Sequence, residues 1–251
     1  MRFYNPVEIN QSKGVRQKII LLCNKKKLLV VCSKSFYKRS YKDKHLLELF
    51  KKSSCIFEHN FSPNPSLEEI HYLNQKYSKI DLDFILGIGG GSAMDVAKIL
   101  SIGIPAYQNE ISIHQLISNA DFFKEINKID TLLVPTTAGT GSEVTPFATV
   151  WDYSENLKLS LCNEKMYAVK TYIDNDFLKN IPLEIALSTG LDALNQAFES
   201  IWNKNANTIT TQYAIKAINL SLKNLNSLEN INRSQKLRED LMSASLFSGI
   251  A

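Results

Sequence analysis

The sequence predicts an α/β domain with a parallel sheet, followed by an all-helical region. Strand-like and helix-like stretches alternate over the first half of the 251 residues, as they do in parallel sheets with right-handed crossovers. A run of three glycines at 89–91 stands at one strand-to-helix junction. Beyond Pro182 the strand patterns stop, and three stretches with helical spacing follow. We therefore expect an α/β domain over 1–180 and the beginning of a helical domain over 181–251.

The individual elements follow from the period of the apolar residues. The expected strands are short, mostly apolar runs at 27–32, 55–58, 80–86, 131–135, 144–151 and 157–162. The expected helices cover 36–52, stretches that begin at Ser66 and near Ser92, 188–202, and two further stretches around 215–225 and 237–247. Ser66 with Glu69 three residues later is a capping-box pattern. The last two strands, joined by a polar turn, predict a hairpin.

Composition and charge exclude several classes of function. Hydrophobic residues make up 44% and charged residues 22% of the chain, which is typical of a soluble globular protein. The net charge is +4, but the basic residues are scattered in short runs, so we expect no nucleic-acid partner. The longest apolar runs have the length of strands, and the first ten residues are not apolar, so we expect neither a membrane span nor a signal peptide. Four cysteines without C-x-x-C spacing favour reduced thiols and a cytoplasmic location.

The glycine run is the first candidate for a ligand site. Glycines at a strand-to-helix junction let the backbone turn tightly and approach a ligand closely. The free N–H groups and the positive dipole end of the following helix suit a phosphate or pyrophosphate. A tight turn without a ligand fits the same residues, because they match neither a Walker loop nor a complete G-x-G-x-x-G pattern.

A second loop, at 136–143, follows the expected strand at 131–135. It offers hydroxyl groups, which bind phosphate and ribose oxygens, at Thr136, Thr137, Thr140 and Ser142. Both loops come after the carboxyl ends of predicted parallel strands, where open α/β sheets bind their ligands. Two turns with hydroxyl-capped ends are the alternative.

The two loops together resemble the iron-containing (group III) alcohol dehydrogenase family. The resemblance rests on GGGSAMD at 89–95 and PTTAGTGSEVTPF at 135–147, with PNP at 63–65 and TGLDAL at 189–194 in the same order. It implies an N-terminal dinucleotide-binding domain, an all-helical C-terminal domain, and a divalent metal, Fe²⁺ or Zn²⁺, between them. It also implies an NAD(P)-dependent enzyme that transfers hydride between the nicotinamide and a small aldehyde, and we expect a homo-oligomer.

The resemblance also assigns residues to the cofactor. The positions on its pyrophosphate side are Gly90, Gly91, Ser92 and Asp95. The positions along the pyrophosphate, ribose and nicotinamide are Thr136, Thr137, Thr140 and Ser142. Lys158 matches a lysine that the family directs toward the cofactor. Without the resemblance, Lys158 would be interpreted as a solvated strand lysine.

Ser33 and Lys34 follow the strand at 27–32, where many family members carry an aspartate that binds the ribose of NAD. Loss of that carboxylate removes a repulsion toward a 2′-phosphate, and a nearby lysine attracts one. These residues therefore predict a preference for NADP(H) over NAD(H).

The metal motif departs from the family. Asp192 is present, but the family's histidine four residues later is replaced by Gln196, whose neutral oxygen is a weaker ligand. The family's other two histidine ligands lie beyond residue 251, and the four histidines of this chain all precede Asp192. Asp192 is either a ligand that acts with residues outside this sequence or a remnant acid, and Glu199 is either an assisting or a structural group. We expect the chain to be the N-terminal part of a longer enzyme.

Within the family, residues 147–152 and 199–207 look most like the phosphonoacetaldehyde reductase branch, which implies an anionic substrate. Lys204 is a candidate cation for it, with a solvated lysine as the alternative. Three other hypotheses stay open: a nucleotide-binding protein without activity, a glycerol-dehydrogenase-like enzyme, and a dehydroquinate-synthase-like enzyme.

Overall fold

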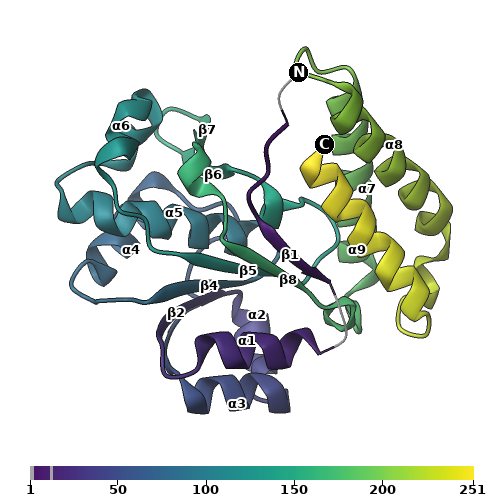
Figure 1. Cartoon of the computed structure of the whole chain (residues 1–251), viewed down its shortest axis with the longest axis horizontal. Helices are drawn as coiled ribbons and strands as arrows, with labels where there is room; N and C mark the ends of the chain where they lie inside the picture. The colour runs from purple at the N-terminus through teal and green to yellow at the C-terminus, as the bar shows by residue number, and fades with distance from the viewer. Residues whose placement is uncertain (1–2, 12–13) are drawn as a thin grey trace.

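Six parallel strands form one sheet in the computed structural model, which describes residues 3–11 and 14–251 (Figure 1). The strands lie in the order β1-β8-β5-β4-β2-β3. Their bounds are β1 Glu8–Gln11, β2 Lys27–Cys32, β3 Ser54–Glu58, β4 Phe84–Gly89, β5 Thr131–Pro135 and β8 Lys170–Ile173. Because all neighbours run parallel, their carboxyl ends share one edge of the sheet.

Alternate residues of the central strands face two opposite layers of helices (Figure 1). In β2, Leu29 and Val31 pack in one hydrophobic cluster, whereas Leu28 and Val30 pack in the other. The first layer contains α4 Leu67–Tyr77, α5 Gly91–Gln108 and α6 Ile113–Ser118. The second contains α1 Val15–Cys23, α2 Lys34–Ser40 and α3 Lys44–Lys52. Burial on both faces explains why β2 is apolar throughout rather than alternating.

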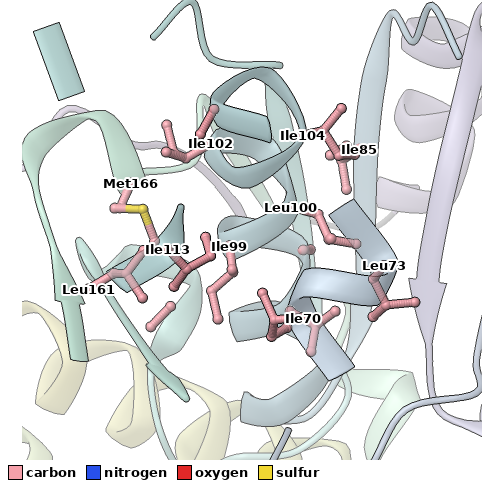
Figure 2. Close-up of a cluster of buried hydrophobic side chains, with 14 of the residues drawn as sticks. Ile70, Leu73, Ile85, Ile99, Leu100, Ile102, Ile104, Ile113, Leu161 and Met166 are labelled. Atoms are coloured by element: carbon pink, nitrogen blue, oxygen red, sulfur yellow. The ribbon is translucent and has the colours of Figure 1, made fainter. Parts of the chain in front are cut away.

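Helix α5 lies at the centre of the larger cluster (Figure 2). Its Ile99 and Leu100 are fully buried, between Leu73 of α4 and Leu161 of the hairpin. The hairpin consists of β6 Phe147–Asp152 and β7 Leu157–Cys162, paired antiparallel. This packing fixes the hairpin beside the helix that begins at the glycine run.

Three helices form the C-terminal region: α7 Leu183–Ile201, α8 Thr208–Asn224 and α9 Gln235–Ile250. Helices α7 and α9 share a hydrophobic cluster with the second loop, because Ala138 and Val144 pack with Ala186 of α7 and Leu241 of α9. Short 3-10 helices complete the chain at η1 Ala120–Glu125, η2 Ser142–Val144, η3 Glu164–Met166, η4 Asn175–Leu178 and η5 Leu225–Asn230. Among the described residues, no helix is both long and apolar enough to cross a membrane.

The predicted fold class is confirmed, and the strands expected at 27–32 and 131–135 have those bounds. The single helix expected over 36–52 is wrong: the chain breaks at residues 41–43, and Asp43 caps α3 by accepting from the N–H groups of His45 and Leu46. The capping box at Ser66 is half present. Its hydroxyl accepts from the Glu69 N–H, but the Glu69 carboxylate binds the N–H of Ser62 instead of that of Ser66.

Other boundaries shift for identifiable reasons. The strand expected at 80–86 is β4, which starts at Phe84 and continues into the glycine run. The strand expected from Val144 begins at Phe147, because Val144 belongs to η2. Helix α7 begins at Leu183 rather than 188. The elements β1, α1 and β8 were not predicted. The boundary near 180 stays a prediction; the last strand of the sheet ends at Ile173.

Candidate cofactor-binding site

The two loops expected to bind a cofactor touch each other at the carboxyl edge of the sheet. The N–H of Thr136, directly after β5, donates to the carbonyl of Gly89 over 2.9 Å. Gly90 is the N-cap of α5, and a methyl group on it would lie 3.2 Å from Oγ1 of Thr137. The first N–H groups of a helix have no intrahelical acceptor, so those of α5 are available to an anion between the loops.

The second loop also packs directly against α5. A methyl group on Gly91 would lie 2.7 Å from Cγ2 of Thr140, so only glycine permits this approach. Thr140 Oγ1 in turn accepts from the N–H of Ser142 over 3.2 Å. The Ser142 hydroxyl donates to Asp95 Oδ1 over 2.6 Å, and the N–H of Thr149 donates to Asp95 Oδ2 over 3.1 Å. Asp95 and Ser142 therefore hold the loop and the hairpin against the helix.

Ser92, the last member of the predicted pyrophosphate group, makes a different contact. Its hydroxyl donates to the carbonyl of Pro63, in the turn before α4. The contact joins a third segment to the glycine run, and it leaves the backbone of α5 as the donor toward a ligand.

The sequence interpretation missed a fully buried lysine in this site. Lys98 is 0% exposed, and its ammonium lies 3.4 Å from Asp95 Oδ1. It also donates to the carbonyls of Ser142, at 3.0 Å, and Phe147, and to Oγ1 of Thr145 at 3.2 Å. Burial lowers the pKa of Lys98, and the Asp95 carboxylate opposes that change. A lone lysine inside an otherwise apolar helix was the signal that could have revealed it.

Glu143 is a second buried charge that the sequence interpretation did not single out. Its side chain is 2% exposed, and Oε2 has no hydrogen-bond partner among the described residues. Burial raises its pKa to about 7, and the field of Lys98 opposes the rise. Near neutral pH this carboxyl is therefore partly protonated.

The end of the second loop contacts the last helix through backbone atoms. Gly141 has φ +60°, a left-handed conformation that glycine adopts without strain. A methyl group there would lie 2.6 Å from the Cα of Gly249 in α9. The loop and the helical region are thus in direct main-chain contact.

A cavity of about 340 Å³ opens beside the start of the second loop. Thr136 lines it, together with Phe36 and Arg39 of α2. Ser33 is the N-cap of this helix, and its Oγ accepts from the N–H of Phe36 over 3.2 Å. Lys34 is exposed and does not line the cavity.

Across the site, helix α7 carries the expected metal ligands. Asp192 is exposed, but partial desolvation by neighbouring atoms and the Glu199 carboxylate raise its pKa, whereas the ammonium of Lys158 on β7 opposes that rise. Lys158 as a cofactor-binding residue stays a prediction. Gln196 Nε2 donates to Ser248 Oγ of α9 over 3.4 Å.

These residues do not by themselves fit a resident metal ion. Asp192 supplies a carboxylate and Gln196 a neutral amide that is already bonded to α9. Within the described parts of the chain, no group of three histidine, cysteine or acidic side chains could hold an ion. Asp192 and Gln196 as metal ligands stay a prediction that needs donors from elsewhere.

Known proteins are similar to this chain in sequence and in fold. The chain is 30% identical over 234 residues to aldehyde-alcohol dehydrogenase 2 of Entamoeba histolytica, covering 90% of this chain and 27% of that enzyme. It is 27% identical over 254 residues to the NADPH-dependent butanol dehydrogenase of Clostridium saccharobutylicum, covering 100% of this chain and 64% of that one. The structure of sulfoacetaldehyde reductase from Bifidobacterium kashiwanohense with NAD⁺ matches with a TM-score of 0.86 and 26% identity, over 99% of this chain and 66% of that one.

Family models account for most of the chain. The model for iron-containing alcohol dehydrogenase matches residues 6–175, which contain both loops. The model for the C-terminal part of the Fe-containing alcohol dehydrogenase family matches 186–251, which contain Asp192. The chain spans less than two thirds of the first relatives' length. The chain belongs to the iron-containing alcohol dehydrogenase family.

Proposed function

We propose that this chain forms the nucleotide-binding part of an enzyme that reduces a small aldehyde to an alcohol with NADPH or NADH. The observation that carries this proposal is the contact between the two loops, Gly90 with Thr137 and Gly91 with Thr140, at the carboxyl edge of the sheet. That edge is where open α/β sheets bind ligands. Family membership supports the same cofactor class.

In this proposal, the two loops bind different parts of the nucleotide. The N–H groups at the start of α5, at Gly91 and Ser92, bind the pyrophosphate, and the hydroxyls of Thr136, Thr137 and Thr140 bind its sugar and phosphate oxygens. Asp95 and Ser142 act indirectly, because their side chains bond to each other. They keep the second loop at the distance that the cofactor needs.

When bound, NADPH or NADH would supply the hydride for the carbonyl carbon of the aldehyde, and water would supply the proton for the carbonyl oxygen. The cofactor carries the redox chemistry, and the protein positions the two reactants. Lys158 lies on β7, close enough to Asp192 of α7 for its charge to lower the pKa of that carboxyl. We assign it to the nicotinamide side of the site.

The substrate class is a two-carbon aldehyde with a tetrahedral anionic group. One relative is named for sulfoacetaldehyde, and a phosphonate has a similar shape with more negative charge. Lys158 and Lys204 are exposed cations that could meet such a group. Phosphonoacetaldehyde, reduced to 2-hydroxyethylphosphonate, is therefore the first substrate to assay.

A second candidate function is nucleotide binding without turnover. Gln196 favours it, because a neutral amide replaces the expected histidine and bonds to Ser248.

The free state of all four cysteines supports a reducing, cytoplasmic compartment. A homo-oligomer is supported by exposed apolar side chains at Leu187 and Leu191 of α7 and at Trp202, directly after it.

One set of measurements separates these proposals. NADPH and NADH binding is measured by nucleotide fluorescence, and oxidation is followed with phosphonoacetaldehyde, sulfoacetaldehyde and butanal, with and without Fe²⁺ or Zn²⁺. Turnover supports the reductase and ranks its substrates. Binding without turnover under every condition supports the second candidate. Failure to bind either nucleotide contradicts both.

A further inference from the structure

The cavity beside the second loop is lined unequally by charged residues. It lies between α2, the start of α3, Thr136, and the segment after β8. The cations on its wall are Arg16, Arg39 and Lys179, and the carboxylates are Asp43 and Asp176. Three positive and two negative groups leave one positive charge in excess.

The pairing of these groups shows where the excess lies. Arg16 forms an ion pair with Asp43, and its Nε lies 2.6 Å from the carboxylate of Asp174. Lys179 lies 3.0 Å from Asp176. Arg39 has no ion pair and no side-chain hydrogen bond among the residues that the structure describes. Its guanidinium is the cation on this wall that is free to bind a ligand.

We propose that Arg39 is the residue that selects NADPH over NADH, by binding the 2′-phosphate of the adenosine ribose. This inference rests on the proposed function, because it takes the cavity to be the adenosine end of the cofactor site. Thr136 supports that placement, since it lines the cavity and also bonds to the glycine run. A guanidinium binds phosphate through two parallel hydrogen bonds, which a lone ammonium does not match.

We assign this role to Arg39 rather than to Lys34 for geometric reasons. The two residues are five positions apart on α2, so their side chains point roughly 140° apart at 100° per residue. Lys34 is exposed outside the cavity, whereas Arg39 lines it. Ser33, directly after β2, has no carboxylate. A carboxylate at this position would repel the 2′-phosphate.

The test measures dissociation constants of the full chain for NADPH, NADH, 2′,5′-ADP and 5′-ADP. The variants are Arg39→Ala, Lys34→Ala and, as a matched control, Lys38→Ala, an exposed residue of the same helix. We expect Arg39→Ala to weaken NADPH and 2′,5′-ADP about 10- to 100-fold, the range for a lost charge-assisted hydrogen bond. NADH and 5′-ADP should change about three-fold or less, as should every ligand of the two lysine variants.

Each contrary result has a distinct meaning. A large loss in Lys34→Ala with none in Arg39→Ala would overturn the assignment in favour of the lysine. Equal losses of NADPH and NADH in Arg39→Ala would show that Arg39 does not recognise the 2′-phosphate. A wild-type chain that binds NADH more tightly than NADPH would overturn this inference and leave the proposed function standing. A wild-type chain that binds none of the four ligands would overturn both.

Discussion

The ammonium of Lys98 lies 3.4 Å from Asp95 Oδ1, one turn away on the same helix, and is completely buried. The pair holds the end of the second loop, because Asp95 accepts from Ser142 and Lys98 donates to the Ser142 carbonyl. The second loop is thus held by an internal charge pair in addition to backbone hydrogen bonds such as the one from Thr136 to Gly89.

Lys98→Met should lower the free energy of unfolding by about 3 kcal/mol or more, because it leaves the Asp95 carboxylate without its positive partner. Urea unfolding followed by circular dichroism measures the loss. Lys124→Met is the control, since Lys124 pairs with Asp121 on the surface and should cost less than about 1 kcal/mol. Equal effects of the two substitutions would show that the buried pair has no special role.

Glu143 should make stability depend on pH. Burial raises its folded-state pKa from 4.5 to about 7, so the folded state holds this proton more tightly than the unfolded state does. The contribution of Glu143 to the free energy of unfolding is therefore fully present below pH 4.5. It decreases as the pH rises toward 7 and stays constant above that pH. The total change is on the order of 3 kcal/mol.

Glu143→Gln keeps the shape of the neutral acid and removes its titration. The melting temperature of this variant should exceed that of the wild type at pH 8 and approach it at pH 4.5. Melting curves measured between these pH values make the comparison. Parallel pH profiles for the two proteins would contradict the assignment of this slope to Glu143.

Gly91→Ala should weaken nucleotide binding about ten-fold, because the new methyl group meets Cγ2 of Thr140 at 2.7 Å and pushes the loops apart. Thr140→Ser removes that carbon and keeps the hydroxyl. The double variant should therefore recover part of the affinity for NADPH, measured by fluorescence titration. A double variant as weak as Gly91→Ala would point to a cause other than this contact.

Gln196→His should raise the affinity of the chain for Zn²⁺, because an imidazole four residues after Asp192 shares its helix face. Isothermal titration calorimetry measures the change, which we expect to be at least ten-fold. Asp192→Asn in the same background should reverse it, while binding of NADPH stays within about three-fold. If Gln196→His gains no affinity for zinc, this face of α7 is not a metal-binding face.

Sequence patterns predicted the parts of the fold that are buried on both sides. After their first residue, β2 and β5 are continuous apolar runs, so their bounds were predictable. β1, with its polar sequence Glu8–Gln11, pairs only with β8, and neither carries a pattern that separates it from a loop. The break between α2 and α3 depends on the Asp43 cap, which an amphipathic pattern does not reveal.

The parts of the candidate site that lie in family motifs could be predicted from the sequence. The parts that depend on tertiary contacts could not. The loops at Gly90 and Thr137 were indicated by their glycines and hydroxyls after predicted strands, and the resemblance assigned them to a nicotinamide cofactor. Lys98 and Glu143 interact across 45 positions of sequence, and their importance lies in burial that no local pattern displays. The sequence singled out Lys34 and not Arg39, because no local pattern shows that Arg39 lines the cavity and Lys34 does not.

The backbone contact between Gly141 and Gly249 joins the second loop directly to α9. A methyl group on Gly141 would lie 2.6 Å from the Cα of Gly249, and one on Gly249 would lie 2.6 Å from the carbonyl oxygen of Gly141. A larger residue at either position would therefore push the loop and α9 apart. Close packing thus restricts both positions to glycine, and the positive φ of Gly141 restricts that position a second time.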